Sequence, residues 1–285
     1  MGKLDGKVAF ITGIARGQGR SHALTLAREG AAIIGIDICQ NIETATYPMS
    51  TPDDLAETVR LVERIGGRIQ AYQADTRDFD AVKRAVEDGV KQFGRLDVVV
   101  ANAATVNGFG ALWEISDHQF RDQWEINVLG VWHTIKATVP TLLEQGEGGS
   151  IVLIASMSGL APELNIGHYV ASKHAVVGLM RNLAAELAPH SIRVNAVCPT
   201  CVNTPMLDNP EFHALFTGRT DAKYEDAFPA MQALNALPVP FVEPVDISNT
   251  VLYLSCDDSR YVTGTNAIVD AGALLPFKMP HLAAM

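Results

Sequence analysis

A glycine-rich turn near the N-terminus, ITGIARGQGRSHAL at 11–24, constrains the fold of this chain more than any other feature. An apolar run at 8–12 precedes the turn and an amphipathic stretch follows it. Its three glycines, Gly13, Gly17 and Gly19, allow the backbone to approach a pyrophosphate closely, and the N–H groups that begin the next helix attract negative charge. The turn therefore predicts a strand–turn–helix unit that holds the phosphates of a nucleotide.

The same alternation of short apolar runs and helical patterns continues along the chain. The predicted buried strands are 8–12, 31–37, 68–75, 96–102, 150–156 and 192–199. Several of the helical stretches between them stop at glycine, as helix C-termini prefer. Strands that alternate with helices indicate right-handed crossovers and a parallel sheet covered on both faces. We therefore expect an α/β protein with a Rossmann-type, doubly wound parallel sheet in three layers, and a single domain over residues 1–285.

Composition excludes several other classes of protein. The 285 residues are 48% hydrophobic, and a net charge of -10 argues against a nucleic-acid-binding surface. No apolar run approaches the roughly 20 residues of a membrane span, and the first residues are too polar for a signal peptide. Four cysteines are too few for a disulfide scaffold. These features predict a cytoplasmic protein that contacts neither nucleic acid nor membrane.

Two segments are longer than a minimal α/β repeat requires. The first, 39–54, is a polar insertion after the second predicted strand, and the second, 201–245, is rich in Pro, Asn and Phe. Long loops inside compact domains are usually functional. Because open α/β sheets bind ligands beyond the carboxyl ends of their strands, we expect 201–245 to form a substrate lid.

An acid at the end of the second predicted strand indicates which dinucleotide is bound. Asp37 follows Gly19 by 18 residues, where a carboxylate can accept hydrogen bonds from the adenosine ribose and would repel a 2′-phosphate. Arg16 and Arg20 could favour that phosphate, but an arginine in this turn can equally contact the pyrophosphate or loop carbonyls. The pattern favours NAD over NADP.

Four polar residues point to a catalytic group. Tyr169 and Lys173 share one helix face, Ser156 ends a strand 13 residues before Tyr169, and Asn127 lies further upstream. With T-G-x-x-x-G-x-G at 12–19, ANAA at 101–104 and YVTGTNAIVDAG near the end, the chain resembles the classical short-chain dehydrogenase/reductases over essentially its whole length.

This resemblance implies a role for each of these four residues. Tyr169 would take the alcohol proton, and the ammonium of Lys173 beside it would lower its pKa from the usual ~10. Ser156 would bind the substrate oxygen, Lys173 would also hold the nicotinamide ribose, and Asn127 would anchor a water linking Lys173 to solvent. Hydride would pass between the carbinol carbon and the nicotinamide.

The resemblance also implies which residues contact NAD. They are Gly13, Arg16, Gly17, Gln18, Gly19, Asp37, Ile38, Cys39, Asp75, Thr76, Asn102, Ala103, Ala104, Tyr169, Lys173, Pro199, Thr200, Val202 and Thr204. Two positions depart from the family pattern, because Ala104 and Thr200 stand where glycine is usual. Thr200 leaves the backbone less free to take positive φ.

The insertion narrows the resemblance to one branch of the family. KLDGKVAFITG, ARGQGRSHA, GIDIC and the run to YPMSTPDDLAETVRLVE resemble the carveol-dehydrogenase-like, mycofactocin-associated members of actinobacteria. That branch implies NAD that stays bound and passes its electrons to the redox carrier mycofactocin. Burying more ligand surface slows dissociation, so a loop folded over NAD would have this effect. A surface insertion far from the cofactor is the alternative.

Substrate and assembly follow less directly from the sequence. Lid residues that favour an apolar substrate, such as a terpenoid or another cyclic secondary alcohol, are Met206, Leu207, Phe212, Leu215, Phe216, Phe228 and Met231. These side chains could instead pack against one another or between subunits. The family resemblance implies a homotetramer with the Tyr169–Lys173 helix at one interface. The sequence leaves open the physiological substrate, its stereochemistry and the direction of reaction.

Other functions fit the sequence less well. Cys198 and Cys201 have the spacing of a redox or zinc pair, but no second pair accompanies them, and we expect no metal. A serine hydrolase would need a G-x-S-x-G turn, which the residues around Ser156 lack. An ordinary ketoacyl- or steroid-type reductase with exchangeable NAD(H) and a non-catalytic NAD-binding regulator remain alternatives.

Overall fold

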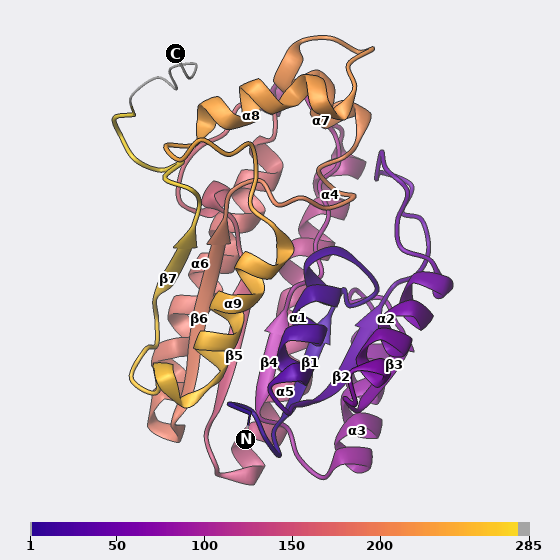
Figure 1. Ribbon diagram of the computed structural model, residues 1–285, viewed down its shortest axis with the longest axis vertical. Coiled ribbons are helices and arrows are strands. Elements are labelled where there is room, and N and C mark those ends of the chain that lie inside the picture. Colours follow the sequence, from indigo (N-terminus) through magenta and orange to yellow (C-terminus); the bar gives the residue numbers. More distant parts are fainter. Residues whose placement is uncertain (1, 279–285) are drawn as a thin grey trace.

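In a computed structural model that describes residues 2–278, seven parallel strands form one sheet (Figure 1). Their order across the sheet is β3-β2-β1-β4-β5-β6-β7. The strands are β1 Val8–Thr12, β2 Ala32–Asp37, β3 Ile69–Gln73, β4 Val98–Ala101, β5 Gly149–Ile154, β6 Ile192–Pro199 and β7 Asn266–Val269. The predicted doubly wound parallel sheet is confirmed. Prediction missed only β7, which is four residues long and only partly buried, and so lacks an apolar run.

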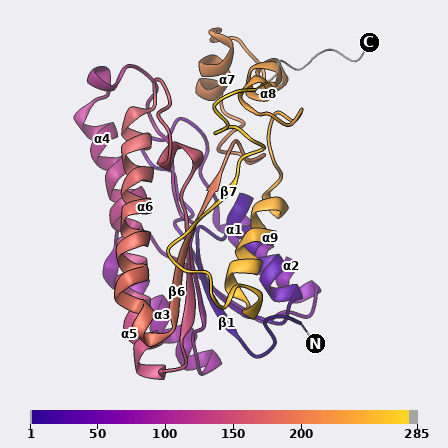
Figure 2. The ribbon, with the colours of Figure 1, turned by 90° about the vertical axis from the view of Figure 1, so that its left-hand side faces the viewer.

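Helices cover both faces of this sheet (Figure 2). One face packs against α1, α2 and α9, and the other packs against α3, α5 and α6. The helix bounds are α1 Gly17–Arg28, α2 Pro52–Arg64, α3 Phe79–Phe93, α4 Asp117–Trp124, α5 Gly130–Gln145, α6 Gly167–Leu187, α7 Pro210–Thr217, α8 Phe228–Leu234 and α9 Pro244–Ser255. A π-helical turn, η2 Glu125–Leu129, joins α4 to α5. Strand residues such as Phe10 and Ile11 are fully buried because they lie between two helical layers.

The N-termini of these helices differ in a way that matters for function. Thr51 and Asp54 form a capping box at α2, and Asp78 caps α3. At α1 the N-cap residue, Arg16, makes no side-chain cap bond, and the first turn contains no acid. The N–H groups at the start of α1 therefore remain available to an anion.

The sheet changes winding direction between β1 and β4, which are neighbours in space although two strands separate them in sequence. The side-chain oxygen of Thr12 accepts hydrogen bonds from the backbone N–H groups of Asn102 and Ala103, both at 3.0 Å. The Asn102 amide in turn donates to the Thr12 carbonyl at 2.8 Å. These bonds bring the glycine turn to the carboxyl ends of the central strands, where α/β sheets bind ligands.

The two long segments lie at this same edge of the sheet. The insertion runs without regular structure from the end of β2 until α2 begins at Pro52. The expected lid contains α7 and α8, which lie beyond the carboxyl ends of the strands at the top of Figure 1. Among the described helices, none combines the length and the apolar character needed to cross a membrane.

Substitution of Gly19 tests how closely the glycine turn packs against its neighbours. A Cβ at Gly19 would lie 1.9 Å from the Gly13 carbonyl oxygen, so Gly19→Ala should lower the free energy of unfolding by about 1–3 kcal/mol and weaken dinucleotide binding. Gly178→Ala is the matched control, because a Cβ on this α6 residue meets no atom within 4 Å and should raise the free energy by about 0.5–1 kcal/mol. Urea unfolding measures both. Equal stability of the two variants would contradict the close packing.

Candidate active site

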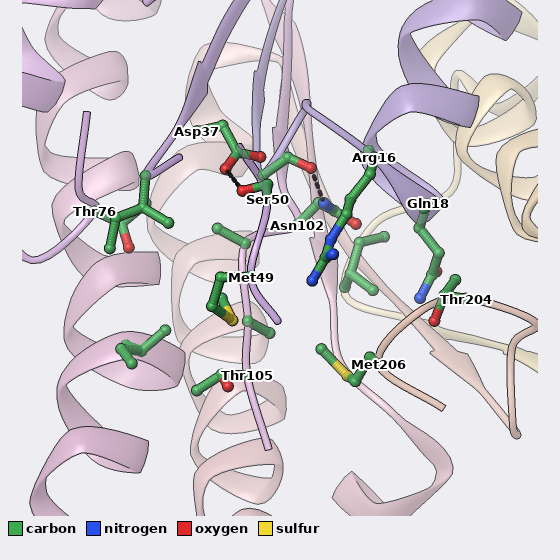
Figure 3. Close-up of a pocket in the computed structure, with 18 of the residues that line it drawn as sticks. Arg16, Gln18, Asp37, Met49, Ser50, Thr76, Asn102, Thr105, Thr204 and Met206 are labelled. Carbon is green, nitrogen blue, oxygen red and sulfur yellow. Dashed lines mark hydrogen bonds between the residues drawn. The ribbon is translucent and has the colours of Figure 1, made fainter. Parts of the chain in front are cut away.

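A cavity of about 160 Å³ opens at the switch point between β1 and β4 (Figure 3). Fifteen of the predicted nucleotide-binding residues line it, and they come from six different segments. They are Gly13, Arg16, Gly17, Gln18, Gly19, Asp37, Ile38, Asp75, Thr76, Asn102, Ala103, Ala104, Tyr169, Lys173 and Thr204. Residues that follow β1, β2, β3 and β4 therefore meet around one space, as a bound dinucleotide would require.

The glycine turn forms the phosphate side of this cavity. Gly13 and Gly17 have φ angles of +70° and +54°, in the left-handed region that side chains other than glycine rarely adopt. A Cβ at Gly17 would come within 3.3 Å of Thr204 across the cavity. Together with the uncapped N-terminus of α1, this narrow cradle fits the pyrophosphate of a dinucleotide.

Asp37 is buried and already accepts three hydrogen bonds from N–H and hydroxyl groups of the protein, besides a weak one from the Cys39 thiol at 3.9 Å. The Ala15 N–H donates to Oδ2 at 2.8 Å, while the Cys39 N–H and the Ser50 hydroxyl both donate to Oδ1. Figure 3 shows the contact with Ser50, which belongs to the insertion. A carboxylate offers about four acceptor positions, so about one remains for a ribose hydroxyl unless Ser50 turns away.

Asp75 and Thr76 border the cavity beyond β3. The Asp75 carboxylate pairs with Arg77 at 2.7 Å, and Arg77 also reaches Asp122 at 3.3 Å. The Thr76 carbonyl contacts the ring of His133 at 2.9 Å. Asp75 therefore lies where the resemblance placed it, but its charge is largely neutralised by Arg77. That ion pair connects the far end of the cavity to α4.

The insertion forms a wall of the cavity. Ile42, Tyr47, Met49 and Ser50 all line it, and Tyr47 is only 5% exposed. In Figure 3, Met49 of the insertion and Arg16 of the glycine turn point into the same space. Prediction identified the segment but not these residues, because an irregular loop has no periodicity that assigns its side chains to a face. A tyrosine in an otherwise polar run was the available signal.

A second cavity, of about 420 Å³, adjoins the first beneath the lid. It is mainly apolar, and Tyr169, Thr204, Met206, Gln18 and Ala155 line both cavities. The predicted residues that line only the second are Ser156, Pro199, Thr200, Val202, Leu207, Phe212, Leu215 and Phe216. Five of the seven expected lid residues thus face this space. The other two, Phe228 and Met231, pack with Tyr224 and Phe241 inside the lid.

Ser156, Tyr169 and Lys173 meet at the boundary between the cavities. Lys173 is buried and its Nζ donates to the Ile154 carbonyl at 3.0 Å. This ammonium lies 5.6 Å from the centre of the Tyr169 ring, against its face. Tyr169 and Lys173 therefore lie on one face of α6, as expected.

The electrostatics of this group differ from the expectation. Burial raises the pKa of Tyr169 above its usual value, and a hydrogen bond with Ser156 acts to lower it. Burial also lowers the pKa of Lys173 to about 8. Without bound ligand, Lys173 does not dominate the pKa of Tyr169, because the ammonium donates to Ile154 and faces the ring instead of the hydroxyl.

Asn127 lies behind the cavities in the π-helical turn η2. Its Oδ1 accepts from the Thr105 N–H at 2.9 Å, and its Nδ2 donates to the Thr105 carbonyl at 3.0 Å and to Ser172 at 3.3 Å. Both ends of the side chain thus hold the loop after β4. The water-anchoring role of Asn127 stays a prediction.

None of the four cysteines lines the nucleotide cavity. Cys39 is buried beside Asp37 with φ +49°, and burial raises its pKa to about 12. Cys198 and Cys201 are both free thiols with pKa values raised by burial. Within residues 2–278, no group of three or more His, Cys, Asp or Glu side chains is placed to hold a metal ion.

Comparison with known proteins agrees with this geometry. A family model described as enoyl-(acyl carrier protein) reductase matches residues 13–273. The (-)-trans-carveol dehydrogenase of Rhodococcus erythropolis is 45% identical over 96% of this chain and all of that protein.

Two solved structures are also similar to this chain. Carveol dehydrogenase from Mycobacterium avium in complex with NAD has a TM-score of 0.95 and 54% identity, covering 96% of this chain and 100% of that one. A short-chain dehydrogenase from Mycobacterium paratuberculosis bound to NAD has a TM-score of 0.88 and 48% identity, covering 95% and 99%. Both are NAD complexes, as the prediction from Asp37 requires.

The charge on Asp37 should set the choice of dinucleotide. Asp37→Asn keeps a hydrogen-bond acceptor but removes the negative charge, whose repulsion of a 2′-phosphate is on the order of 1–3 kcal/mol. The ratio of NADP affinity to NAD affinity should therefore rise about tenfold or more. Isothermal titration of stripped protein measures both affinities. Asp53→Asn is the control, because Asp53 is an exposed carboxylate outside the cavity. An unchanged ratio in Asp37→Asn would contradict this role.

Proposed function

The chain belongs to the short-chain dehydrogenase/reductase family, and from that premise we propose that it interconverts an apolar secondary alcohol and its ketone while its NAD stays bound. Members of this family related to it are NAD-dependent oxidoreductases of the alcohol dehydrogenase type, and so is this chain. The observation that carries the proposal is the pair of adjoining cavities, one formed by the glycine turn and Asp37 and the other lying beneath the lid, which share Tyr169. A terpenoid or another cyclic alcohol fits the apolar cavity by chemistry, as does the carveol of the named relatives.

The proposed chemistry assigns one task to each polar residue at the boundary. NAD supplies the hydride acceptor when it is bound. Tyr169 transfers the hydroxyl proton of the substrate, and Ser156 holds the substrate oxygen as charge develops on it. Lys173, with a pKa of about 8, is predominantly charged at neutral pH and loses that charge as the pH rises through this value. Its ammonium faces the ring of Tyr169, so its charge offsets only part of the burial that disfavours the phenolate.

Retention of NAD is proposed because the insertion closes over the nucleotide cavity. We call residues 39–50 the strap. At its C-terminal end the strap is held by Ser50 on Asp37 and by the Arg16 guanidinium on the Pro48 carbonyl. Just before Pro48, the Tyr47 hydroxyl contacts Thr105 Oγ1 at 3.2 Å.

A second contact fixes the strap to the opposite side of the cavity. Thr44 donates to the buried Asp122 carboxylate of α4 at 2.7 Å and accepts from the Asn107 amide at 2.7 Å. The strap thus spans from β2 to the loop after β4 and to α4. Dissociation of NAD would require several of these hydrogen bonds to break together, which slows it.

If NAD stays bound, the NADH formed must be re-oxidised on the enzyme by an electron acceptor that binds there. We propose that mycofactocin re-oxidises the bound cofactor, as the resemblance to the mycofactocin-associated branch implies. A homotetramer with α6 at one interface and a cytoplasmic, actinobacterial setting belong to the same proposal. An artificial electron acceptor should replace the carrier in an assay, whereas added free NAD should not.

Tyr169→Phe tests the assignment of the proton-transfer residue. Loss of the hydroxyl should lower kcat for carveol oxidation by about 10²–10⁴-fold, because no other hydroxyl takes over the proton transfer. Bound NAD, measured after denaturation of the protein, should be unchanged. Tyr253→Phe, on the exposed face of α9, should keep full activity. Wild-type kcat in Tyr169→Phe would refute the role.

The strap is tested by weakening its hydrogen bonds without shortening it. A double variant, Thr44→Val with Tyr47→Phe, removes contacts worth on the order of 1–3 kcal/mol, so NAD should dissociate about tenfold or more faster. Gel filtration followed by assay of the retained nicotinamide measures this rate. Glu43→Gln, an exposed position on the same segment, is the control. Equal retention by the double variant and the control would contradict the strap.

A further inference from the structure

Ser156 belongs to a chain of hydrogen bonds that ends at a carboxyl group in the wall of the apolar cavity. The hydroxyl oxygens of Ser156 and Ser158 are 2.9 Å apart, and Ser158 Oγ lies 3.0 Å from Glu163 Oε1. The Ser158 N–H also donates to Ser156 Oγ at 3.1 Å. Among the described residues that line this cavity, Glu163 is the only Asp, Glu, Lys or Arg. A single acid in a mainly apolar pocket calls for an explanation.

The number of protons in this chain fixes the direction of its hydrogen bonds. Each serine has one hydroxyl proton, and an ionised carboxylate can only accept. When Glu163 is ionised, Ser158 donates to it, so Ser158 Oγ must accept from Ser156. The Ser156 proton then points along the chain and away from the cavity.

The direction reverses when Glu163 is neutral. The carboxyl group then donates to Ser158, Ser158 donates to Ser156, and the Ser156 proton is free to point to the substrate oxygen. The proton on Glu163 comes from bulk solvent, and each hydroxyl only rotates, so no O–H bond of a serine breaks. With respect to the substrate oxygen, ionisation of Glu163 thus removes Ser156 as a hydrogen-bond donor.

The negative charge of ionised Glu163 also makes the ionisation of its neighbours less favourable. The ionisable groups that face it are Tyr169 on α6 and the thiol of Cys201 after β6, and the negative charge of Glu163 raises the pKa of both. Burial raises the pKa of Glu163 itself, and the bond from Ser158 lowers it. The neutral form of Glu163 therefore persists to higher pH than for an exposed glutamate, and it favours ionisation of Tyr169 as well as donation by Ser156.

We propose that Glu163 is a positioning residue whose protonation state decides whether Ser156 donates a hydrogen bond to the substrate oxygen. This proposal rests on the proposed function in one respect, namely that Ser156 and Tyr169 contact the substrate oxygen. Neutral Glu163 is the active form in both directions, since both pass through the same transition state, in which charge develops on the oxygen.

The pH dependence of ketone reduction tests this positioning role. Protein whose bound cofactor has been reduced is mixed with carvone, and the rate of a single turnover is measured from about pH 5 to about pH 9. The wild-type rate should fall by up to about 100-fold as Glu163 ionises, the cost of losing one donor to a developing oxyanion. Glu163→Gln should lack this decrease but keep the one caused by Lys173 near pH 8. A wild-type profile in Glu163→Gln would overturn the proposal.

Ser158→Ala gives a result that a merely structural role would not produce. With the chain cut, ionised Glu163 can no longer turn the Ser156 O–H away from the substrate through Ser158, so at the alkaline side of the transition this variant should react faster than wild type. Glu87→Gln, an exposed residue of α3, should match wild type throughout. A Ser158→Ala rate at or below wild type at every pH would overturn the proposal.

An infrared measurement decides the same question without turnover. The carbonyl stretch of protonated Glu163, obtained as wild type minus Glu163→Gln, should disappear with rising pH. In Ser158→Ala it should persist to higher pH, because the ionised form has lost its donor. An unchanged titration would overturn the proposal. If no variant or wild type reacts with carvone or carveol, the proposed function fails, while this measurement still supports or refutes the coupling.

Discussion

The site depends on the clamp that joins the carboxyl ends of β1 and β4. Thr12 and Asn102 exchange backbone and side-chain hydrogen bonds there, and Gly13 and Gly19 pack so closely that a Cβ at Gly19 would collide with the backbone. Because the clamp fixes the start of α1, it also fixes the direction in which the open N–H groups of that helix point. The phosphate cradle therefore follows from packing inside the sheet, before any ligand is considered.

Sequence could predict the elements that repeat and the residues that belong to spaced motifs. The strand 8–12, the glycine turn and the pair Tyr169 and Lys173 are set by local periodicity and short spacing, so their positions followed from the residues alone. By contrast, β7 is short and half-buried and carries little periodic signal. The order of the strands across the sheet depends on contacts between distant segments, but the rule that crossovers are right-handed leaves few possible orders.

The parts that sequence could not predict are contacts between irregular segments. Tyr47 and Ser50 face the nucleotide cavity because of the path of the strap, and nothing in their spacing assigns them to that side. The pKa of Tyr169 is the other example. Proximity to Lys173 suggested a lowered value, but the burial of the hydroxyl outweighs it in the protein alone. Desolvation depends on every neighbouring segment, so it is not visible in a four-residue motif.

The strap and the lid come from opposite halves of the chain, and both enclose the boundary at which Tyr169 lies. The central claim is that this enclosure holds one NAD and reduces it in place. The direct measurement is the absorbance of nicotinamide in extensively dialysed wild-type protein, before and after addition of carveol with no free cofactor present. We expect about one NAD per chain, converted to NADH by the alcohol. Protein that contains no nicotinamide, or whose NAD is unchanged by any secondary alcohol, would contradict it.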